Sequence, residues 1–570
     1  MLKRLIKSVR EYKRDSILTP IMMTFEVVMD VIIPILMAKI IDNGIEPGDM
    51  NYIWKMGSIL IIAAAAGKLA ARASAGFAKN LRHDMYYNIQ NFSFSNIDKF
   101  STASLITRMT TDVTNVQNAY QMVIRMLARA PMMLILAMIM TFNINVRLGF
   151  IFVFVVPILA VGLFGIAIKV HPIFVRVFRR YDNLNTVVEE NVRSIRVVKS
   201  FVNEDYENEK FHERSTDIYN NFVKAEKMLA FNNPLMQLCI YTCILLISWL
   251  GAKMIVSRTM TTGEMMSIFA YTMQILNSLM MISMVFVMII ISRTSANRIV
   301  EVLEEESDLR NSNNPIFSVK DGSVEFDHVD FSYIKDENKL CLKDINISIN
   351  SGEVVGIMGG TGSAKTTLIH LIPRLYDVTG GSVKIGGIDV RDYDMDTLRN
   401  EVAVVLQKNV LFSGTIKDNL RWGNEDASDE ELVRACKIAQ ADDFIRSFPE
   451  GYDTYIEQGG SNISGGQKQR LCIARALLKE PKILILDDST SAVDTKTDAL
   501  IRKALRTEIP NTTKIIIAQR ISSVEDADKI IILNDGRIDG IGTSEELLKT
   551  NRIYQEIYNS QIKGALYDGK

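Results

Sequence analysis

Long apolar runs alternate with charged segments along the first half of the chain. Runs of roughly 20 or more residues, long enough to cross a lipid bilayer, lie near 17–41, 52–78, 119–142, 147–170, 228–256 and 263–291. Three of the connections between them are short, whereas 79–118 and 171–227 are long, polar and rich in Lys and Arg. The six runs predict six membrane helices. Because connections rich in Lys and Arg stay on the cytosolic side, the N-terminus, both long connections and everything after 292 are predicted to be cytosolic. The protein is then a multi-pass plasma-membrane protein with both termini cytosolic.

The two long connections show helical periodicity. In "VVEENVRSIRVVKSFVNEDYENEKFHE" (187–213) apolar residues recur three or four positions apart, which is the spacing of one helix face. The membrane helices are therefore expected to continue into the cytosol. The stretches around 98–106 and 202–211 could turn sideways and contact a cytosolic domain.

Three of the predicted spans carry pairs of charged residues four positions apart. They are Glu26 with Asp30, Lys68 with Arg72, and Arg125 with Arg129. Charges at membrane depth are costly and need a partner or a polar environment. Two interpretations follow: ion pairs between helices, or a polar cavity that meets a substrate and is lined by Glu26, Asp30, Arg125 and Arg129.

The second half of the chain has the pattern of a soluble α/β domain. "SVEFDHVDFSY" (323–333) alternates as a half-buried strand does, and "GEVVGIM" (352–358) reads as a buried strand that leads into "GGTGSAKTTLIHLI" (359–372). A strand, a glycine-rich loop and a helix form the setting of a phosphate-binding P-loop. The predicted organisation is a membrane domain (1–306), a linker (307–322), a nucleotide-binding domain (323–562) and a tail (563–570).

The P-loop supplies most of the candidate nucleotide contacts. Backbone amides around the loop would surround a polyphosphate at a helix N-terminus, Lys365 would reach the β and γ phosphates, and Thr366 would bind Mg²⁺. The candidate residues are Gly359, Gly360, Thr361, Gly362, Ser363, Ala364, Lys365, Thr366 and Thr367.

Two further motifs carry related chemistry. "KILILDD" (482–488) is a strand that ends in two carboxylates, of which Asp487 could hold Mg²⁺ and Asp488 could orient a water. "NISGGQKQRLCIARALL" (462–478) contains a Ser-Gly-Gly turn at the start of a helix, which is a second set of amides suited to a phosphate. One chain therefore carries two phosphate-binding turns.

With these motifs the chain resembles the ATP-binding cassette (ABC) family, specifically exporter half-transporters with a membrane domain ahead of the cassette. The resemblance implies that ATP and Mg²⁺ bind between two cassettes, at the P-loop of one and the signature turn of the other. It implies that Tyr333 stacks on adenine, that Gln407 contacts the metal with Thr366 and Asp487, and that 491–494 form the D-loop. The signature residues are Ser464, Gly465, Gly466 and Gln467, and the stretches near 98–106 and 202–211 would be coupling helices.

Three positions depart from the family pattern. Ala364 replaces a P-loop glycine, Asp488 stands in place of the catalytic glutamate, and Gln519 stands in place of the switch histidine. The methyl group of Ala364 matters only if the backbone there needs a positive φ or touches a phosphate. Asp is one methylene shorter than Glu, and neutral Gln cannot act as an imidazole. We therefore expect ATP binding at this P-loop with poor hydrolysis.

These departures point to one half of a heterodimer whose partner supplies the missing Glu and His. The resemblance implies ATP-driven export of hydrophobic compounds, as in bacterial multidrug exporters. Two alternatives stay open: a nucleotide-gated channel or sensor, and a homodimeric exporter of lipid or peptide. The net charge of −1 gives no indication of nucleic-acid binding.

Overall fold

The computed structural model describes residues 1–45, 50, 70–489 and 491–567, and it divides into two compact units. One unit contains Met1–Asn91 and Phe100–Glu305, and the other contains Phe92–Lys99 and Glu306–Lys570. The second unit thus includes a short excursion from the N-terminal half of the chain. The sequence predicts a contact with a cytosolic domain for the stretch around 98–106, which overlaps the end of this excursion.

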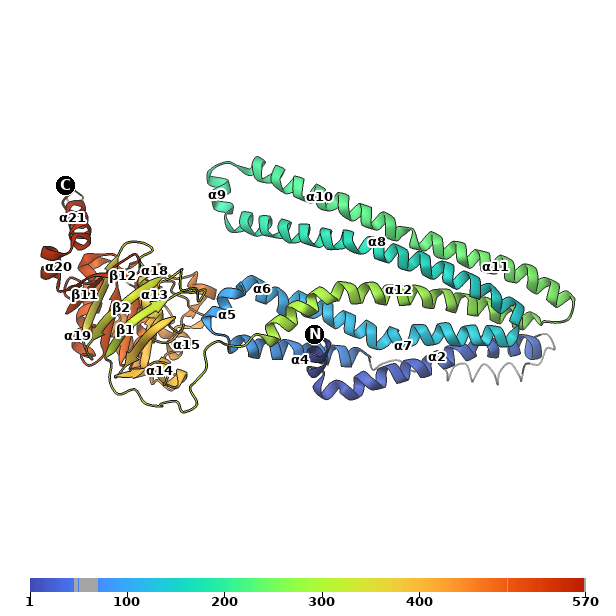
Figure 1. Cartoon of the computed structure of the whole chain (residues 1–570), viewed down its shortest axis with the longest axis horizontal. Helices are drawn as coiled ribbons and strands as arrows, with labels where there is room; N and C mark the ends of the chain where they lie inside the picture. The colour runs from blue at the N-terminus through green and yellow to red at the C-terminus, as the bar shows by residue number, and fades with distance from the viewer. Residues whose placement is uncertain (46–49, 51–69, 490, 568–570) are drawn as a thin grey trace. The chain divides into compact units, whose positions relative to one another are not determined.

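The first unit is helical, and its longest helices run side by side (Figure 1). Its α-helices are α1 (Leu2–Lys7), α2 (Lys13–Ile40), α4 (Ala70–Gln90), α6 (Thr102–Thr107), α7 (Val113–Ile144), α8 (Val146–Arg193), α9 (Ile195–Ser200), α10 (Glu204–Ala230), α11 (Asn232–Val256) and α12 (Thr262–Glu304). Helices α2, α7 and α12 pack on one another, and α8 packs along α10 and α11.

Within the described residues, five helical segments are long and apolar enough to cross a membrane. They are Arg10–Asn43, Thr102–Ile144, Val146–Phe174, Glu204–Val256 and Thr262–Glu304. Each contains one of the predicted apolar runs, so these five predictions are confirmed. The sixth predicted run, 52–78, lies largely outside the described residues.

Capping side chains fix where two of the long helices, α8 and α12, begin. Asn145 separates α7 from α8, and its side-chain oxygen accepts hydrogen bonds from the amides of Arg147 (3.0 Å) and Leu148 (3.3 Å). Thr261 forms a capping box with Glu264 at the start of α12. Such caps satisfy amides that have no partner within the helix.

The predicted sideways segments lie a few residues too far along the chain. The first excursion is the short helix α5 (Phe94–Lys99), and the second is α9 (Ile195–Ser200) with the turn at 201–203. The stretch 204–211, predicted to turn sideways, instead begins the long helix α10. Its acidic residues Glu204, Asp205 and Glu207 stand in the first turn of α10, where they complement the helix dipole.

The second unit is built on three sheets. A six-stranded sheet has the order β12-β11-β3-β10-β9-β6, a four-stranded antiparallel sheet has the order β2-β1-β4-β5, and β7 pairs with β8. The strands are β1 (Val324–Phe331), β2 (Leu342–Ile349), β3 (Val354–Gly359), β4 (Gly380–Ile385), β5 (Ile388–Asp389), β6 (Val402–Val405), β7 (Gly414–Thr415), β8 (Tyr455–Ile456), β9 (Ile483–Asp487), β10 (Thr513–Ile517), β11 (Lys529–Asn534) and β12 (Arg537–Gly542). The predicted strands at 323–333, 352–358 and 482–488 are confirmed as β1, β3 and β9.

Helices flank these sheets. They are α5 (Phe94–Lys99), α13 (Lys365–Leu371), α14 (Met395–Glu401), α15 (Ile416–Arg421), α16 (Asp429–Ile438), α17 (Asp442–Arg446), α18 (Gly465–Leu477), α19 (Thr495–Glu508), α20 (Ser544–Thr550) and α21 (Arg552–Tyr567). The described chain is therefore a helical membrane domain followed by an α/β domain, as the sequence predicts.

The central parallel strands place the predicted motifs at one edge of the sheet. Strand β10 lies between β3 and β9, and Ile517 of β10 is in register with Ile357 of β3 and with Asp487 of β9. The carboxyl ends of the three strands are therefore level. In open parallel sheets this edge is where ligands bind.

Candidate active site

The P-loop joins the end of β3 to the start of α13. Gly362 has a φ of 83°, which glycine adopts without strain, and a Cβ atom built at Gly360 or Gly362 would meet nothing within 4 Å. The backbone is therefore open at these two positions. An anion can approach the amides here as it does in other P-loops.

Ala364 adopts the left-handed conformation, with φ 69° and ψ 25°, immediately before the first residue of α13. The sequence analysis expects the methyl group of Ala364 to matter only if the backbone there has a positive φ or touches a phosphate. The first of these two conditions is met. A non-glycine residue in this conformation costs about 1–2 kcal/mol. The loop keeps its shape despite that cost, because α13 and β3 fix both of its ends.

Lys365 turns its ammonium group back into the loop. Its Nζ donates to the carbonyl oxygens of Gly359 (3.0 Å) and Gly360 (2.7 Å) and to the hydroxyl of Ser363 (3.2 Å). Burial lowers the pKa of this ammonium, while the carboxylates of Asp487 and Asp488 act in the opposite direction. The positive charge is thus centred where the P-loop would receive phosphate oxygens.

Thr366 and Asp487 form the oxygen pair expected for Mg²⁺. The Thr366 hydroxyl donates to the two carboxylate oxygens of Asp487 at 3.0 and 3.3 Å. Asp487 is only 2% exposed, and burial raises its pKa. Within the described residues no group of three or more Asp, Glu, His or Cys side chains could hold a metal by itself. The pair fits Mg²⁺, which is commonly held by one or two protein oxygens together with substrate phosphates and water.

Asp488 accepts hydrogen bonds from two other candidate residues, Gln519 and Gln407. Its Oδ2 accepts a hydrogen bond from Nε2 of Gln519 at 2.8 Å and a longer one from Nε2 of Gln407 at 3.4 Å. Burial raises the pKa of Asp488, and the two amide donors oppose that rise. Gln407, predicted as a metal contact, thus donates to Asp488.

A cavity of about 670 Å³ opens beside the P-loop. It is lined by residues 362–367, by the turn at Asp535 and Gly536, and by Leu340, Cys341 and Lys343. The predicted adenine contact, Tyr333, is 43% exposed, and its hydroxyl lies 3.0 Å from Oγ1 of Thr367 in the P-loop helix. This aromatic side chain is therefore tied to the helix that follows the phosphate loop.

The signature turn forms a regular helix start. The Ser464 hydroxyl accepts from the amide of Gln467 at 3.3 Å, and the Gln467 side-chain oxygen accepts from the amide of Ser464 at 2.9 Å. Ser464 and Gly465 are exposed. In the described part of the chain, no hydrogen bond joins residues 464–467 to the P-loop, so the two phosphate-binding turns of one chain are separate.

Three residues around this site were not predicted from the sequence. Gln469 accepts from the amide of Ala492 in the D-loop (3.0 Å), and Arg520 donates to the carbonyl oxygens of Ser491 and Val493 (3.2 and 3.3 Å). Gln561 near the C-terminus contacts the loop that follows β10. Gln469 and Arg520 lie within two residues of predicted motif residues, which was the available signal. The sequence around Gln561 carries no such signal.

The charged residues of the membrane unit form an ion-paired cluster. Arg129 on α7 contacts Glu26 through Nη1 (3.0 Å) and Asp30 through Nη2 (2.9 Å), and both carboxylates belong to α2. The ion-pair interpretation therefore describes three of the four candidate cavity residues. Arg125, the fourth, is exposed. Of the remaining pair, Arg72 lies 3.8 Å from Asp15, and Lys68 lies outside the described residues.

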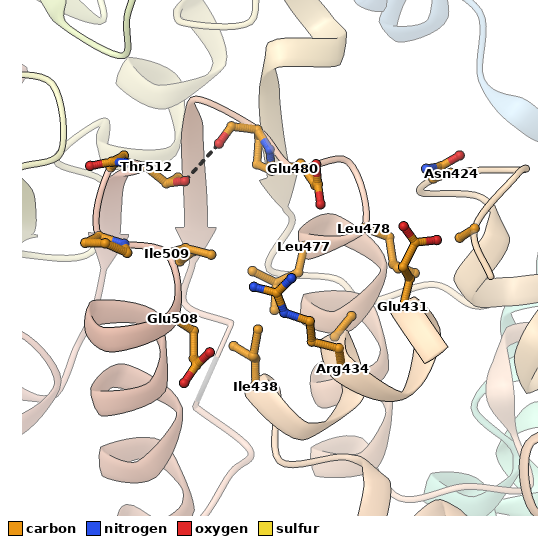
Figure 2. Close-up of a pocket in the computed structure, with 15 residues that line it drawn as sticks. Asn424, Glu431, Arg434, Ile438, Leu477, Leu478, Glu480, Glu508, Ile509 and Thr512 are labelled. Atoms are coloured by element: carbon orange, nitrogen blue, oxygen red, sulfur yellow. Dashed lines mark hydrogen bonds between the residues drawn. The ribbon is translucent and has the colours of Figure 1, made fainter. Parts of the chain in front are cut away.

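A second cavity of about 300 Å³ lies at the opposite ends of the central strands, and it contains none of the predicted residues (Figure 2). It lies between α16, the end of α18 and the loop between α19 and β10. The hydroxyl of Thr512 donates to the carbonyl of Pro481 at 3.0 Å across its rim. We assign no ligand to this cavity.

Comparison with known proteins agrees with this geometry. The ABC transporter transmembrane region matches residues 17–279, and the ABC transporter family model matches residues 342–491. The uncharacterized ABC transporter ATP-binding protein YfiB of Bacillus subtilis (strain 168) is 37% identical over 95% of each chain. The ATP-dependent lipid A-core flippase of Desulfotalea psychrophila is 32% identical over 86% of this chain and 85% of its own length.

A solved structure shares the fold. It is described as a bacterial Atm1-family ABC exporter with ATP bound, and it matches with a TM-score of 0.83 over 96% of this chain and 99% of its own. Because the two sequences are only 24% identical, this likeness supports the fold alone.

Proposed function

The chain belongs to the ABC transporter family as an exporter half-transporter, and we propose that it is the subunit with the degenerate ATP site in a heterodimeric exporter of hydrophobic compounds. A transporter of this family couples ATP to transport across a membrane. Residues 1–306 would form the membrane domain, 307–322 the linker and 323–562 the ATP-binding domain, with both termini in the cytosol.

The hydrogen bond between Gln519 and Asp488 carries the proposal. Hydrolysis needs a carboxylate that can reach the attacking water and a side chain that contacts the γ-phosphate. Here the shorter carboxylate accepts the amide of Gln519 at 2.8 Å. This contact engages one of the two N–H donors of the Gln519 amide and draws the Asp488 oxygen toward it. The Asp488 carboxylate is then poorly placed to activate the attacking water, and the neutral amide of Gln519 cannot act as an imidazole does.

Nucleotide binding needs other residues, and these are in place. Lys365 and the amides of the P-loop would hold the phosphates, and Thr366 with Asp487 would hold Mg²⁺, which neutralises developing negative charge during phosphoryl transfer. Tyr333 would stack on the base. We therefore infer that this site binds Mg-ATP and hydrolyses it slowly.

The unaltered signature turn supports a partner with a competent site. Ser464 and Gly465 are exposed, and the Ser464–Gln467 capping box holds the turn open. In a head-to-tail pair of cassettes this turn would complete the ATP site of the partner. The partner would contribute the glutamate and histidine that this chain lacks.

Exposed apolar surfaces on each unit also favour a dimer. Phe201 and Val202 at the end of α9 are 77% and 82% exposed. On the second unit a groove of about 310 Å³ is bordered by Phe412 and Trp422, whose rings stack with centroids 4.1 Å apart. Large exposed apolar side chains of this kind mark protein contacts. We infer that the α9 turn of one subunit docks on the cassette of the other.

The excursion at α5 offers a route for coupling within the second unit. The hydroxyl of Tyr376 donates to Asp98 at 2.7 Å, and the Tyr376 ring packs edge-on against Tyr333 with centroids 5.1 Å apart. Ser93 and Ser95 donate to Asp308 at 2.6 and 2.8 Å. Movement of α5 would therefore shift Tyr376, which packs against the predicted adenine contact Tyr333.

Lipid export is a second candidate. The observation that favours it is the similarity to the ATP-dependent lipid A-core flippase, a transporter of lipid. A homodimeric exporter of lipid or peptide would not need the asymmetric partner. A third candidate function is a channel or sensor that binds ATP without pumping. Transport against a gradient in proteoliposomes would exclude this function.

Restoring the altered pair tests the main proposal. The adjacent reading frames are searched for a second half-transporter, the chain is purified together with it, and Asp488→Glu with Gln519→His is introduced into this subunit. We expect ATPase activity of the complex to rise, because a second site becomes competent. Full activity of the unaltered chain as a homodimer, without any increase from the double substitution, would reject the proposal.

A further inference from the structure

The last described helix, α21, reaches the loop that carries Gln519. The side-chain nitrogen of Gln561 donates to the backbone carbonyl of Gln519 at 2.8 Å, and its side-chain oxygen accepts from the amide of Ile521 at 2.9 Å. One amide side chain thus holds both ends of the segment 519–521.

Helix α21 is well anchored before it reaches this loop. Tyr554 is fully buried, its hydroxyl lies 2.8 Å from that of Ser544, and its amide donates to Asn551 at 2.8 Å. Gln561 lies seven residues after Tyr554, so both project from nearly the same face of the helix. The anchor at Tyr554 therefore fixes where Gln561 can reach.

The segment held by Gln561 carries the contact that defines the site. Gln519 presents its backbone carbonyl to Gln561 and its side chain to Asp488. Arg520, between the two positions bound by Gln561, contacts the D-loop. A change in the backbone at 519–521 would therefore move the Gln519 amide relative to Asp488.

We propose that Gln561 is a positioning residue for the ATP site, through which α21 fixes the Gln519 side chain at the γ-phosphate end of the bound nucleotide. The inference rests on the proposed function, since it takes the P-loop of this chain as a nucleotide site. It assigns to the C-terminal helix a part in distinguishing ATP from ADP.

The discriminating measurement compares a nucleotide that has a third phosphate with one that lacks it. Binding of Mg-AMP-PNP and of Mg-ADP is measured on the purified full-length chain in nanodiscs. Gln561→Ala should weaken AMP-PNP binding about three- to tenfold, the usual effect of losing one or two neutral hydrogen bonds. ADP affinity should stay within about twofold, because Gln519 is placed for the γ-phosphate.

Gln555→Ala is the matched control. Gln555 lies on the same helix and donates to the carbonyl of Leu548 at 2.8 Å, away from the 519–521 segment. This variant should bind both nucleotides as the unaltered chain does. In a Gln519→Ala background, Gln561→Ala should have no additional effect, since it acts through Gln519.

Hydrogen exchange gives a second readout that needs no nucleotide. The amide of Ile521 should exchange faster in Gln561→Ala than in Gln555→Ala. Equal weakening of AMP-PNP and ADP, or no effect on either nucleotide, would overturn the proposal while leaving the nucleotide site intact. Failure of the unaltered chain to bind either nucleotide would reject the proposed function as well.

Discussion

Arg129 on α7 holds Asp30 on α2 through an ion pair of 2.9 Å, and its other terminal nitrogen holds Glu26 at 3.0 Å. Two carboxylates thus share one guanidinium between two helices predicted to span the membrane. Because unpaired charge is costly in such surroundings, each of the three side chains depends on the others.

Removal of the cation should therefore cost more than removal of the whole cluster. We expect Arg129→Met to lower the unfolding temperature in detergent by several degrees, since two carboxylates lose their partner. The triple variant with Glu26→Gln and Asp30→Asn should recover most of the loss. If the pair Glu26→Gln and Asp30→Asn instead impairs export of cationic compounds more than neutral ones, with unchanged stability, the cavity interpretation holds.

Ala364→Gly should strengthen nucleotide binding at this P-loop. Glycine adopts φ 69° without the cost of a left-handed alanine, which is about 1–2 kcal/mol. The expected gain in ATP affinity is at most about five- to thirtyfold, measured by equilibrium binding to the full-length chain. Gly362→Ala, at φ 83° in the same loop, should have the opposite effect. No detectable nucleotide in the unaltered loop would mean that the methyl group is far more costly than its backbone strain.

Substitutions in the signature turn and in this chain's own catalytic pair should reduce ATPase activity by different amounts. Ser464→Arg places a large side chain at the turn that, on the proposed function, would complete the partner's site, and we expect it to reduce steady-state ATPase of the complex by about two orders of magnitude. Asp488→Asn should change turnover little, since that carboxylate is already engaged by Gln519. A larger loss of turnover from Asp488→Asn than from Ser464→Arg would show that the assignment of the competent and degenerate sites is reversed.

Stability of the second unit should rise with pH above about 8. Lys514 is 2% exposed, and burial lowers its pKa from 10.5 to about 8. Between these two values the unfolded chain binds more protons than the folded one, so the free energy of unfolding increases with pH. Thermal unfolding followed from pH 7.5 to 10 measures this rise. In Lys514→Met the same rise should be smaller, and an identical slope in both proteins would exclude Lys514 as its source.

Tyr376→Phe should weaken coupling while sparing ATP binding. The change removes the hydrogen bond to Asp98 and keeps the ring against Tyr333. We expect substrate stimulation of the ATPase to fall about threefold, with basal ATPase nearly unchanged. Tyr452→Phe, which removes a similar 2.8 Å hydrogen bond to Asp442 elsewhere in the same unit, serves as the control. Equal losses in the two variants would argue against a route through α5.

The parts predicted from the sequence are those in which a motif dictates the backbone. The P-loop lies between β3 and α13 because its glycines and lysine require that setting, and Asp487 ends a strand of β-branched and leucine residues. The apolar runs predicted five of the spans correctly because bilayer thickness sets the length of a membrane helix.

Contacts made between distant segments were not predicted. No local pattern indicates that Gln561 meets Gln519 or that Tyr376 meets Asp98, because each contact depends on how separate elements pack. The stretch 202–211 was predicted to turn sideways, whereas residues from Glu204 onward form α10, because periodicity alone does not show where one helix ends and the next begins. The contact of Gln407 Nε2 with Asp488 at 3.4 Å was not predicted either, and the role of Gln407 as a metal contact stays a prediction.

The excursion at Phe92–Lys99 imposes an order on biosynthesis. This segment leaves the ribosome long before any residue of the unit in which it packs, so Ser93 and Asp98 wait for Asp308 and Tyr376 to be made. A nascent chain that stalls before the cassette is complete therefore leaves this segment without the residues on which it packs in the finished protein.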